Sequence, residues 1–261
     1  MSTANPYKPP VAHVDDVASG AAGSGTFING GRTVSAGQGW AWITGGFDLF
    51  KKQPGIWIAL VVVLFVIVLV LAFIPLLGAL ATVLLMPVFV GGMMLGCQAL
   101  QRDGPLEMGH LFAGFKTQTG NLVALGAIAI AGWIVVMVPV ILIVGVGAFF
   151  GAMSGDAAGA VAMGGSFLIA WLIAMALSVL LYMALWFAPA LVVLHGVAPV
   201  AAVKQSFFGC LKNVVPFLLY GIIMMVLSIV ATIPILLGWL VLGPVLIASV
   251  YVAYEDIYFE G

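Results

Sequence analysis

Long apolar runs separated by short polar breaks constrain this chain more than any other feature of its sequence. A helix needs about 20 apolar residues to cross the hydrocarbon core of a bilayer. Six runs approach or exceed that length, at residues 56–74, 79–100, 122–150, 167–194, 214–235 and 239–254. We therefore predict an all-α membrane protein whose six transmembrane helices form three successive hairpins.

The composition indicates that lipid surrounds most of the chain. Of the 261 residues, 64% are hydrophobic and 7% are charged, whereas a soluble domain carries about 25% charged residues. The net charge of −1 provides no basic field that would attract a nucleic acid. We therefore predict membrane lipids as partners, with other membrane proteins or a second copy of the chain as further candidates, and no nucleic acid.

The first 35 residues differ from the rest of the sequence. They are rich in Pro, Gly, Ala and Ser and show no apolar period, which is typical of disordered segments. They also lack the apolar run of a signal peptide. We predict a disordered tail at residues 1–35, followed by a polytopic transmembrane domain at residues 36–261.

Positive charge is confined to alternate connections between the predicted spans. All Lys and Arg residues lie before the first span, between the second and third spans, or between the fourth and fifth spans. The connections on the opposite side carry Asp156 as their single charge. Because cytoplasmic loops are enriched in Lys and Arg, we predict that both termini lie on the cytoplasmic side of the membrane.

A short pattern precedes the first span of each hairpin. Two apolar residues spaced by three are followed by a lysine, and residues at this spacing share one face of a helix. We predict that each pattern forms an interfacial helix on the cytoplasmic side, so that interfacial helix, span and span repeat three times. Tryptophans near the first span are expected to anchor it at the headgroup level, or to form part of a partner surface. The predicted interfacial surface comprises Trp40, Trp42, Phe47, Phe50, Lys51, Lys52, Phe112, Phe115, Lys116, Phe208, Leu211 and Lys212.

Several of these segments resemble a known group of proteins. The residues that carry the resemblance are Gly39, Trp40 and Trp42 with residues 51–54, then residues 111–116, 201–206 and 254–258. The chain resembles the uncharacterised six-span bacterial inner-membrane proteins of the YciC type. Those proteins are distantly similar to the membrane domain attached to some glycerophosphoryl diester phosphodiesterases. The resemblance implies a six-span inner-membrane fold, and it does not extend to a phosphodiesterase domain.

The predicted spans contain no Asp, Glu, Lys, Arg or His. Ionisable residues inside a membrane usually mark ion paths or proton relays, so this pattern disfavours proton-coupled transporters, ion pumps and aspartyl intramembrane proteases. The sequence also has no recognisable catalytic motif. We therefore expect no enzymatic activity, no cofactor and no metal site. Met93, Met94 and Cys97 suggest a Cu(I) site, but packing of apolar side chains explains them better.

Two hypotheses for the function remain. The first is a non-enzymatic inner-membrane component that organises or assists other membrane proteins or lipids through its interfacial segments. The second is a permease or channel for a small neutral or lipid-like solute, with a cavity shaped by prolines in the spans. Such a path would be lined by hydroxyl groups from Ser178, Tyr182, Ser228, Thr232 or Ser249.

Overall fold

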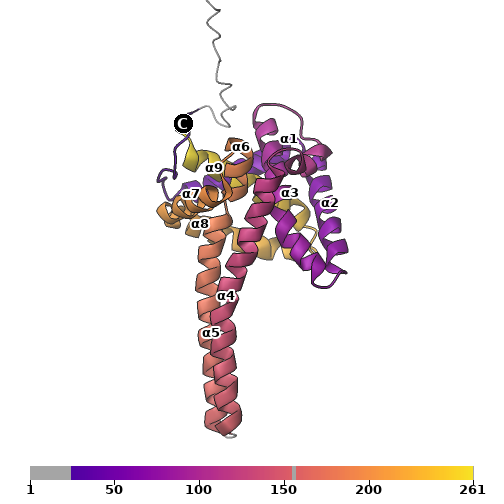
Figure 1. Cartoon of the computed structure of the whole chain (residues 1–261). Coiled ribbons are helices and arrows are strands. Elements are labelled where there is room, and N and C mark those ends of the chain that lie inside the picture. Colours follow the sequence, from indigo (N-terminus) through magenta and orange to yellow (C-terminus); the bar gives the residue numbers. More distant parts are fainter. Residues whose placement is uncertain (1–24, 155–156, 261) are drawn as a thin grey trace, which may run out of the picture.

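A computed structural model describes residues 25–154 and 157–260 (Figure 1). Within these ranges the chain is helical, and its β-structure is limited to an isolated bridge between Phe27 and Phe259. The helices are α1 (Gln38–Lys52), α2 (Pro54–Ala72), α3 (Leu77–Gln101), the 3-10 helix η1 (Met108–Phe115), α4 (Thr119–Ser154), α5 (Ala157–Leu185), α6 (Ala188–His195), α7 (Pro199–Lys212), α8 (Val214–Thr232) and α9 (Trp239–Tyr258).

Six helical segments of the described chain are long and apolar enough to cross a membrane. They are α2, α3, α4, the combined segment Ala157–His195, α8 and α9. This confirms the predicted all-α fold with six candidate membrane-spanning helices. The last helix continues beyond its predicted end at residue 254, so that Glu255 and Asp256 lie on its final turn. A helix, α1, η1 or α7, also precedes each pair of spans, while the repeat and the interfacial position of these helices remain predictions.

Helices α3 and α9 form the centre of the bundle. They are the most buried of the candidate spans, whereas α5 is the least buried. Helix α1 packs closely along α9, because a Cβ atom on Gly46 would lie 2.8 Å from the carbonyl oxygen of Val245. Several of the largest fully buried side chains are aromatic residues of α1, α2 and α9, namely Trp42, Trp57, Tyr251, Tyr254 and Tyr258.

The hairpin of α4 and α5 extends well beyond the rest of the bundle (Figure 1). Helix α4 has 36 residues, and at 1.5 Å per residue it is about 54 Å long. Helix α2 has 19 residues, which corresponds to about 28 Å. Glycines such as Gly147 and Gly151 allow α4 to approach α5 closely. The three hairpins therefore differ strongly in length.

The fourth candidate span is interrupted between α5 and α6, whereas the sequence predicts a continuous run at residues 167–194. Pro189 has no amide hydrogen, so it cannot donate to the carbonyl four residues earlier. Two other backbone groups at this break are bound by Ser206 of α7: the amide of Phe187 donates to Ser206 Oγ over 2.9 Å. The same hydroxyl donates to the carbonyl of Met183 over 2.8 Å. One buried serine thus stabilises the break.

Residues 25–35 run beside the C-terminal end of α9, although the sequence assigns them to the tail. The amide of Ile28 donates to the Tyr258 carbonyl, and the amide of Arg32 donates to the Ile257 carbonyl, both over 2.8 Å. Asn213 accepts from the amide of Val34 and donates to the carbonyl of Arg32. We call residues 25–35 the N-terminal strap. Residues 1–24 lie outside the described part of the chain, so disorder there remains a prediction.

Candidate functional site

Only some residues of the predicted interfacial surface are exposed. Six of its apolar residues are exposed on α1, η1 and α7, namely Trp40, Phe47, Phe112, Phe115, Phe208 and Leu211. Trp42 and Phe50 are buried, with exposed fractions of 1% and 7%. The prediction for these two residues is corrected, because both side chains belong to the core and neither can contact lipid or a partner.

The indole N–H of Trp42 has a hydrogen-bond acceptor inside the protein, so the side chain can be buried without an unpaired polar group. A buried indole usually donates its N–H to a partner, and here Nε1 donates to Asp256 Oδ2 over 2.8 Å. The ring also packs against Phe217, with a centroid distance of 5.1 Å. Trp57, a predicted anchor of the first span, is fully buried and donates to the carbonyl of Leu49. Neither indole is an interfacial anchor.

The lysines of the predicted surface have different environments. Lys51 pairs with Asp48 on the exposed side of α1, and Lys116 is exposed after η1. Lys52 donates to Asp103 over 2.9 Å and to the carbonyl of Leu100 over 2.7 Å. The hydrogen bond and the charge of Lys52 lower the pKa of Asp103.

Lys212, the third lysine of the pattern, binds the backbone of the N-terminal strap. It donates to the carbonyls of Gly30 and Gly31. Lys52 and Lys212 therefore hold loops of the protein, whereas Lys51 and Lys116 are exposed and can reach lipid phosphates.

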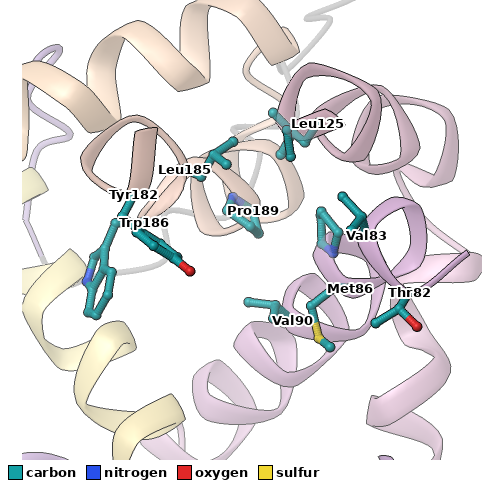
Figure 2. Close-up of a pocket in the computed structure, with 11 residues that line it drawn as sticks. Thr82, Val83, Met86, Val90, Leu125, Tyr182, Leu185, Trp186 and Pro189 are labelled. Carbon is teal, nitrogen blue, oxygen red and sulfur yellow. The ribbon is translucent and has the colours of Figure 1, made fainter. Parts of the chain in front are cut away.

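Two apolar cavities flank the break between α5 and α6. The first, of about 360 Å³, lies between α3, α4, α5 and α6. Figure 2 shows Val83, Met86 and Val90 of α3 on one side of it, and Trp186 and Pro189 on the other. The second, of about 460 Å³, lies between α5, α7, α8 and α9. Tyr182 and Trp186 line both, so the two cavities are neighbours on either side of the end of α5.

The chemistry of these cavities favours apolar molecules. Their linings contain no charged side chain. The hydroxyl of Thr82, in the first cavity, donates to the carbonyl of Gly78 on its own helix. Cys210, in the second cavity, is a poor nucleophile, because burial raises the pKa of its thiol to about 12 and the thiolate is the reactive form. Both volumes lie in the range of about 300–1,000 Å³ that is usual for ligand pockets.

A further cavity of about 530 Å³ lies between α1, α8 and α9. Trp40 and Phe47 of the predicted surface line it, opposite Pro234 and Gly238. These two residues are spaced by seven, about two helical turns, so they share a face of α1. The sequence pattern, which pairs Phe47 with Phe50, does not reveal the groove, because its other wall comes from the last hairpin.

Among the described residues, no group of three or more His, Cys, Asp or Glu side chains is arranged to hold a metal ion. Met93, Met94 and Cys97 are buried in the core, where they pack with apolar neighbours.

Sequence reasoning did not identify the polar cluster at the end of α9. Arg32 pairs with Asp256 Oδ1 over 3.1 Å and donates through Nε to the backbone carbonyl of the same residue over 2.7 Å. Asn213 is fully buried beside this cluster. The only signal in the sequence was the resemblance of residues 254–258 to the YciC-type membrane proteins.

Six apolar helical segments with extensive exposed apolar surface define an integral, multi-pass membrane protein. The comparisons agree. The chain is 28% identical over 207 residues to a protein of Burkholderia thailandensis described as "Probable inner membrane protein", and the match covers 75% of each chain. No family model and no solved structure matches the chain. We conclude that the chain is a multi-pass protein of a bacterial inner membrane.

Proposed function

We propose that this protein is a non-enzymatic inner-membrane component that holds a lipid or lipid-like molecule between its helices, and through it organises lipids or neighbouring membrane proteins. The observation that carries the proposal is the pair of apolar cavities beside the α5–α6 break. The walls offer dispersion contacts and almost no hydrogen-bonding groups, so an acyl chain fits them better than a polar solute.

Access to the cavities supports the same proposal. Val179, Tyr182 and Leu218 line the second cavity, and their exposed fractions are 53%, 56% and 59%. They belong to candidate spans, so in a bilayer their exposed faces contact acyl chains. A lipid tail can therefore enter from the side without crossing a polar barrier.

Transport of a small neutral or lipid-like solute is the alternative. Three of the hydroxyl groups expected to line a polar path are bonded within the bundle. Ser228 donates to the carbonyl of Met224, Thr232 donates to that of Ser228, and Ser249 pairs with Tyr220. These contacts favour an apolar occupant over a water-filled path. Movement of a lipid-like solute would use the same cavities.

The orientation of the protein in the membrane and its resemblance to YciC-type proteins are also part of the proposal. We call the end of the bundle where the three hairpins begin and end, at Lys51, Lys52, Arg102, Lys116 and Lys212, the basic end. The positive-inside rule supports a cytoplasmic position for it. The resemblance to YciC-type proteins supports the six-span inner-membrane fold, and phosphodiesterase activity is no part of the proposal.

A cavity-filling substitution tests the proposal. Gly221 lines the second cavity, and a Cβ atom there would meet no atom within 4 Å. Gly164, on the α4–α5 hairpin, is equally open and lines neither cavity, so Gly164→Leu is a matched control. Native mass spectrometry of protein released from nanodiscs would count the retained lipids. We expect Gly221→Leu to lose a lipid that Gly164→Leu keeps.

Equal retention by the two variants would exclude the second cavity as the lipid site. Release of a defined soluble small molecule in place of lipid would instead favour the permease. A stoichiometric protein partner without lipid would restrict the role to organising proteins.

A further inference from the structure

The three hairpins do not reach the same depth. Leu76, in the turn between α2 and α3, lines a groove together with Ile141 of α4, so the turn lies beside the middle of α4. Helix α4 continues from there to Ser154, which is 154 − 141 = 13 residues further. At 1.5 Å per residue this is about 20 Å. Figure 1 shows the α4–α5 hairpin extending alone beyond the α2–α3 hairpin.

The extending part of this hairpin is apolar and exposed. Large apolar side chains there have exposed fractions of 56% to 75%, namely Leu142, Val146, Phe149, Phe150, Met153 and Val161. If the hydrocarbon core ended at the α2–α3 turn, these side chains would be in water. A projecting apolar surface of this kind is unfavourable in water, which favours hydrocarbon around this part of the hairpin.

The turns of the two shorter hairpins have a composition that suits hydrocarbon. Residues 74–78 and 233–238 contain only Ile, Leu, Pro and Gly. Leu76 and Ile235 are exposed by 74% and 89%. Both also have positive φ angles, of 63° and 51°, which in water-exposed turns are usually taken by Gly, Asn or Asp. Apolar side chains thus occupy positions where the backbone favours small or polar ones.

Backbone hydrogen bonds in these turns are made internally. In the first turn, Leu77 donates to the Pro75 carbonyl and Gly78 to the Ile74 carbonyl. In the second turn, Leu237 donates to the carbonyl of Pro234. The prolines bring no N–H of their own.

Polar side chains at the base of the second turn are also bonded to each other, since Trp239 Nε1 donates to Thr232 Oγ1 over 3.3 Å. Internal bonding of this kind is what a non-helical segment needs where water is absent.

We propose that acyl chains cover both turns: residues 74–78 and 233–238 lie inside the hydrocarbon core, and the α4–α5 hairpin alone reaches the far headgroup layer, near Ser154. Most of the protein then lies in the leaflet at its basic end. The leaflet at the opposite side contains little more than the two helices of one hairpin. This proposal is independent of the occupant of the cavities.

Cysteine accessibility tests the depth of each turn. Leu76→Cys, Leu236→Cys, Ser154→Cys and Thr117→Cys would be made in the full chain, in which the native Cys97 and Cys210 are buried. Intact spheroplasts and inverted vesicles would be treated with a membrane-impermeant maleimide. We expect Ser154→Cys to react from one face and Thr117→Cys from the other. Leu76→Cys and Leu236→Cys should react at least about tenfold more slowly from both faces, and fully after SDS denaturation.

A second measurement distinguishes lipid from protein as the cause of slow labelling. Nitroxides attached at positions 76, 236 and 154 would be exposed to oxygen, which concentrates in hydrocarbon, and to a water-soluble nickel chelate. Oxygen should dominate at 76 and 236, and the chelate at 154. Labelling of Leu76→Cys from the same face and at the same rate as Ser154→Cys, or dominance of the chelate at 76, would overturn the proposal. The same results at 236 would overturn it for the last hairpin.

Discussion

Trp42 of α1 donates its indole hydrogen to the Asp256 carboxylate of α9 over 2.8 Å, across 214 residues of sequence. The second oxygen of this carboxylate pairs with Arg32 of the N-terminal strap over 3.1 Å. One acidic side chain therefore joins the strap, the first helix and the last helix. Because Trp42 is buried, the contact is shielded from water.

Loss of the indole N–H should destabilise the protein. Trp42→Phe retains an aromatic ring but leaves Asp256 Oδ2 without this donor, which should lower the free energy of unfolding by about 1–3 kcal/mol. Thermal unfolding in a mild detergent would measure the change. Trp40→Phe is the matched control, because Trp40 is exposed on the same helix, and it should leave the midpoint nearly unchanged. Equal midpoints for the two variants would contradict the assigned role of Trp42.

Asn213 should determine whether the N-terminal strap stays docked. It is fully buried and bonds to Val34, Arg32 and Gly209. Asn213→Leu would leave these backbone groups without their partner, at a cost of about 1–3 kcal/mol for each buried group. We expect faster proteolytic cleavage within residues 25–35 and a lower unfolding midpoint. Asn29→Leu, at an exposed position of the same strap, should have little effect, and similar cleavage of both variants would refute the prediction.

The close approach of α1 to α9 should depend on Gly46. A Cβ atom there would lie 2.7 Å from the Ser249 amide nitrogen, and overpacking of this kind costs about 1–3 kcal/mol. Gly46→Ala should therefore lower the unfolding midpoint. Gly55→Ala is the control, because a Cβ atom at Gly55 meets nothing within 4 Å, and an alanine in a helix is favoured over glycine by about 1 kcal/mol. The two substitutions should act in opposite directions.

The Lys52–Asp103 pair predicts a pH dependence with a defined sign. The hydrogen bond and charge of Lys52 lower the pKa of Asp103 below its ordinary value of 3.8 in the folded protein. A lowered folded pKa means that the unfolded state binds the proton more tightly, so the pair stabilises the fold above pH 3.8. This stabilisation is lost as the pH falls through the folded pKa.

Asp103→Asn checks this sign directly. The variant should unfold at a slightly lower temperature than the parent at pH 7, since the pair is solvent-exposed and therefore weak. The difference should shrink as the pH is lowered below 3.8. A difference that grows on acidification would show that the sign is wrong.

Much of the fold follows from the sequence, because lipid imposes a simple requirement of length and apolar composition on each span. The paired arrangement of the six candidate spans follows from the short breaks. The break after α5 was missed because Ser206, which binds the backbone of Phe187 and Met183 there, lies on a different helix and a local pattern cannot reveal it. The strap was missed because its composition, low in apolar residues, is typical of a disordered tail. Its hydrogen bonds are made to Asn213 and to α9, which are distant in sequence.

The candidate site was harder to predict than the fold. The spacing of Phe47 and Phe50 indicates a shared face, but residues three apart differ by about 60° around a helix. That difference is enough for Phe50 to be buried and Phe47 to be exposed. Each cavity is lined by side chains from four helices that are distant in sequence. A local sequence pattern does not show which of these side chains meet. Tyr182 is the one expected path residue that lines both of them.

The contact between α1 and α9 has a consequence for the order in which the protein assembles. Spans enter the membrane as the ribosome delivers them, from the N-terminal side onward. Helix α1 is made early, yet the Asp256 carboxylate that receives its indole hydrogen is made more than 200 residues later. The first helix must therefore wait, with its inward face unmatched, until α9 has been inserted. Final packing is consequently a late step of biogenesis, and a chain truncated before α9 would leave α1 exposed to quality-control proteases.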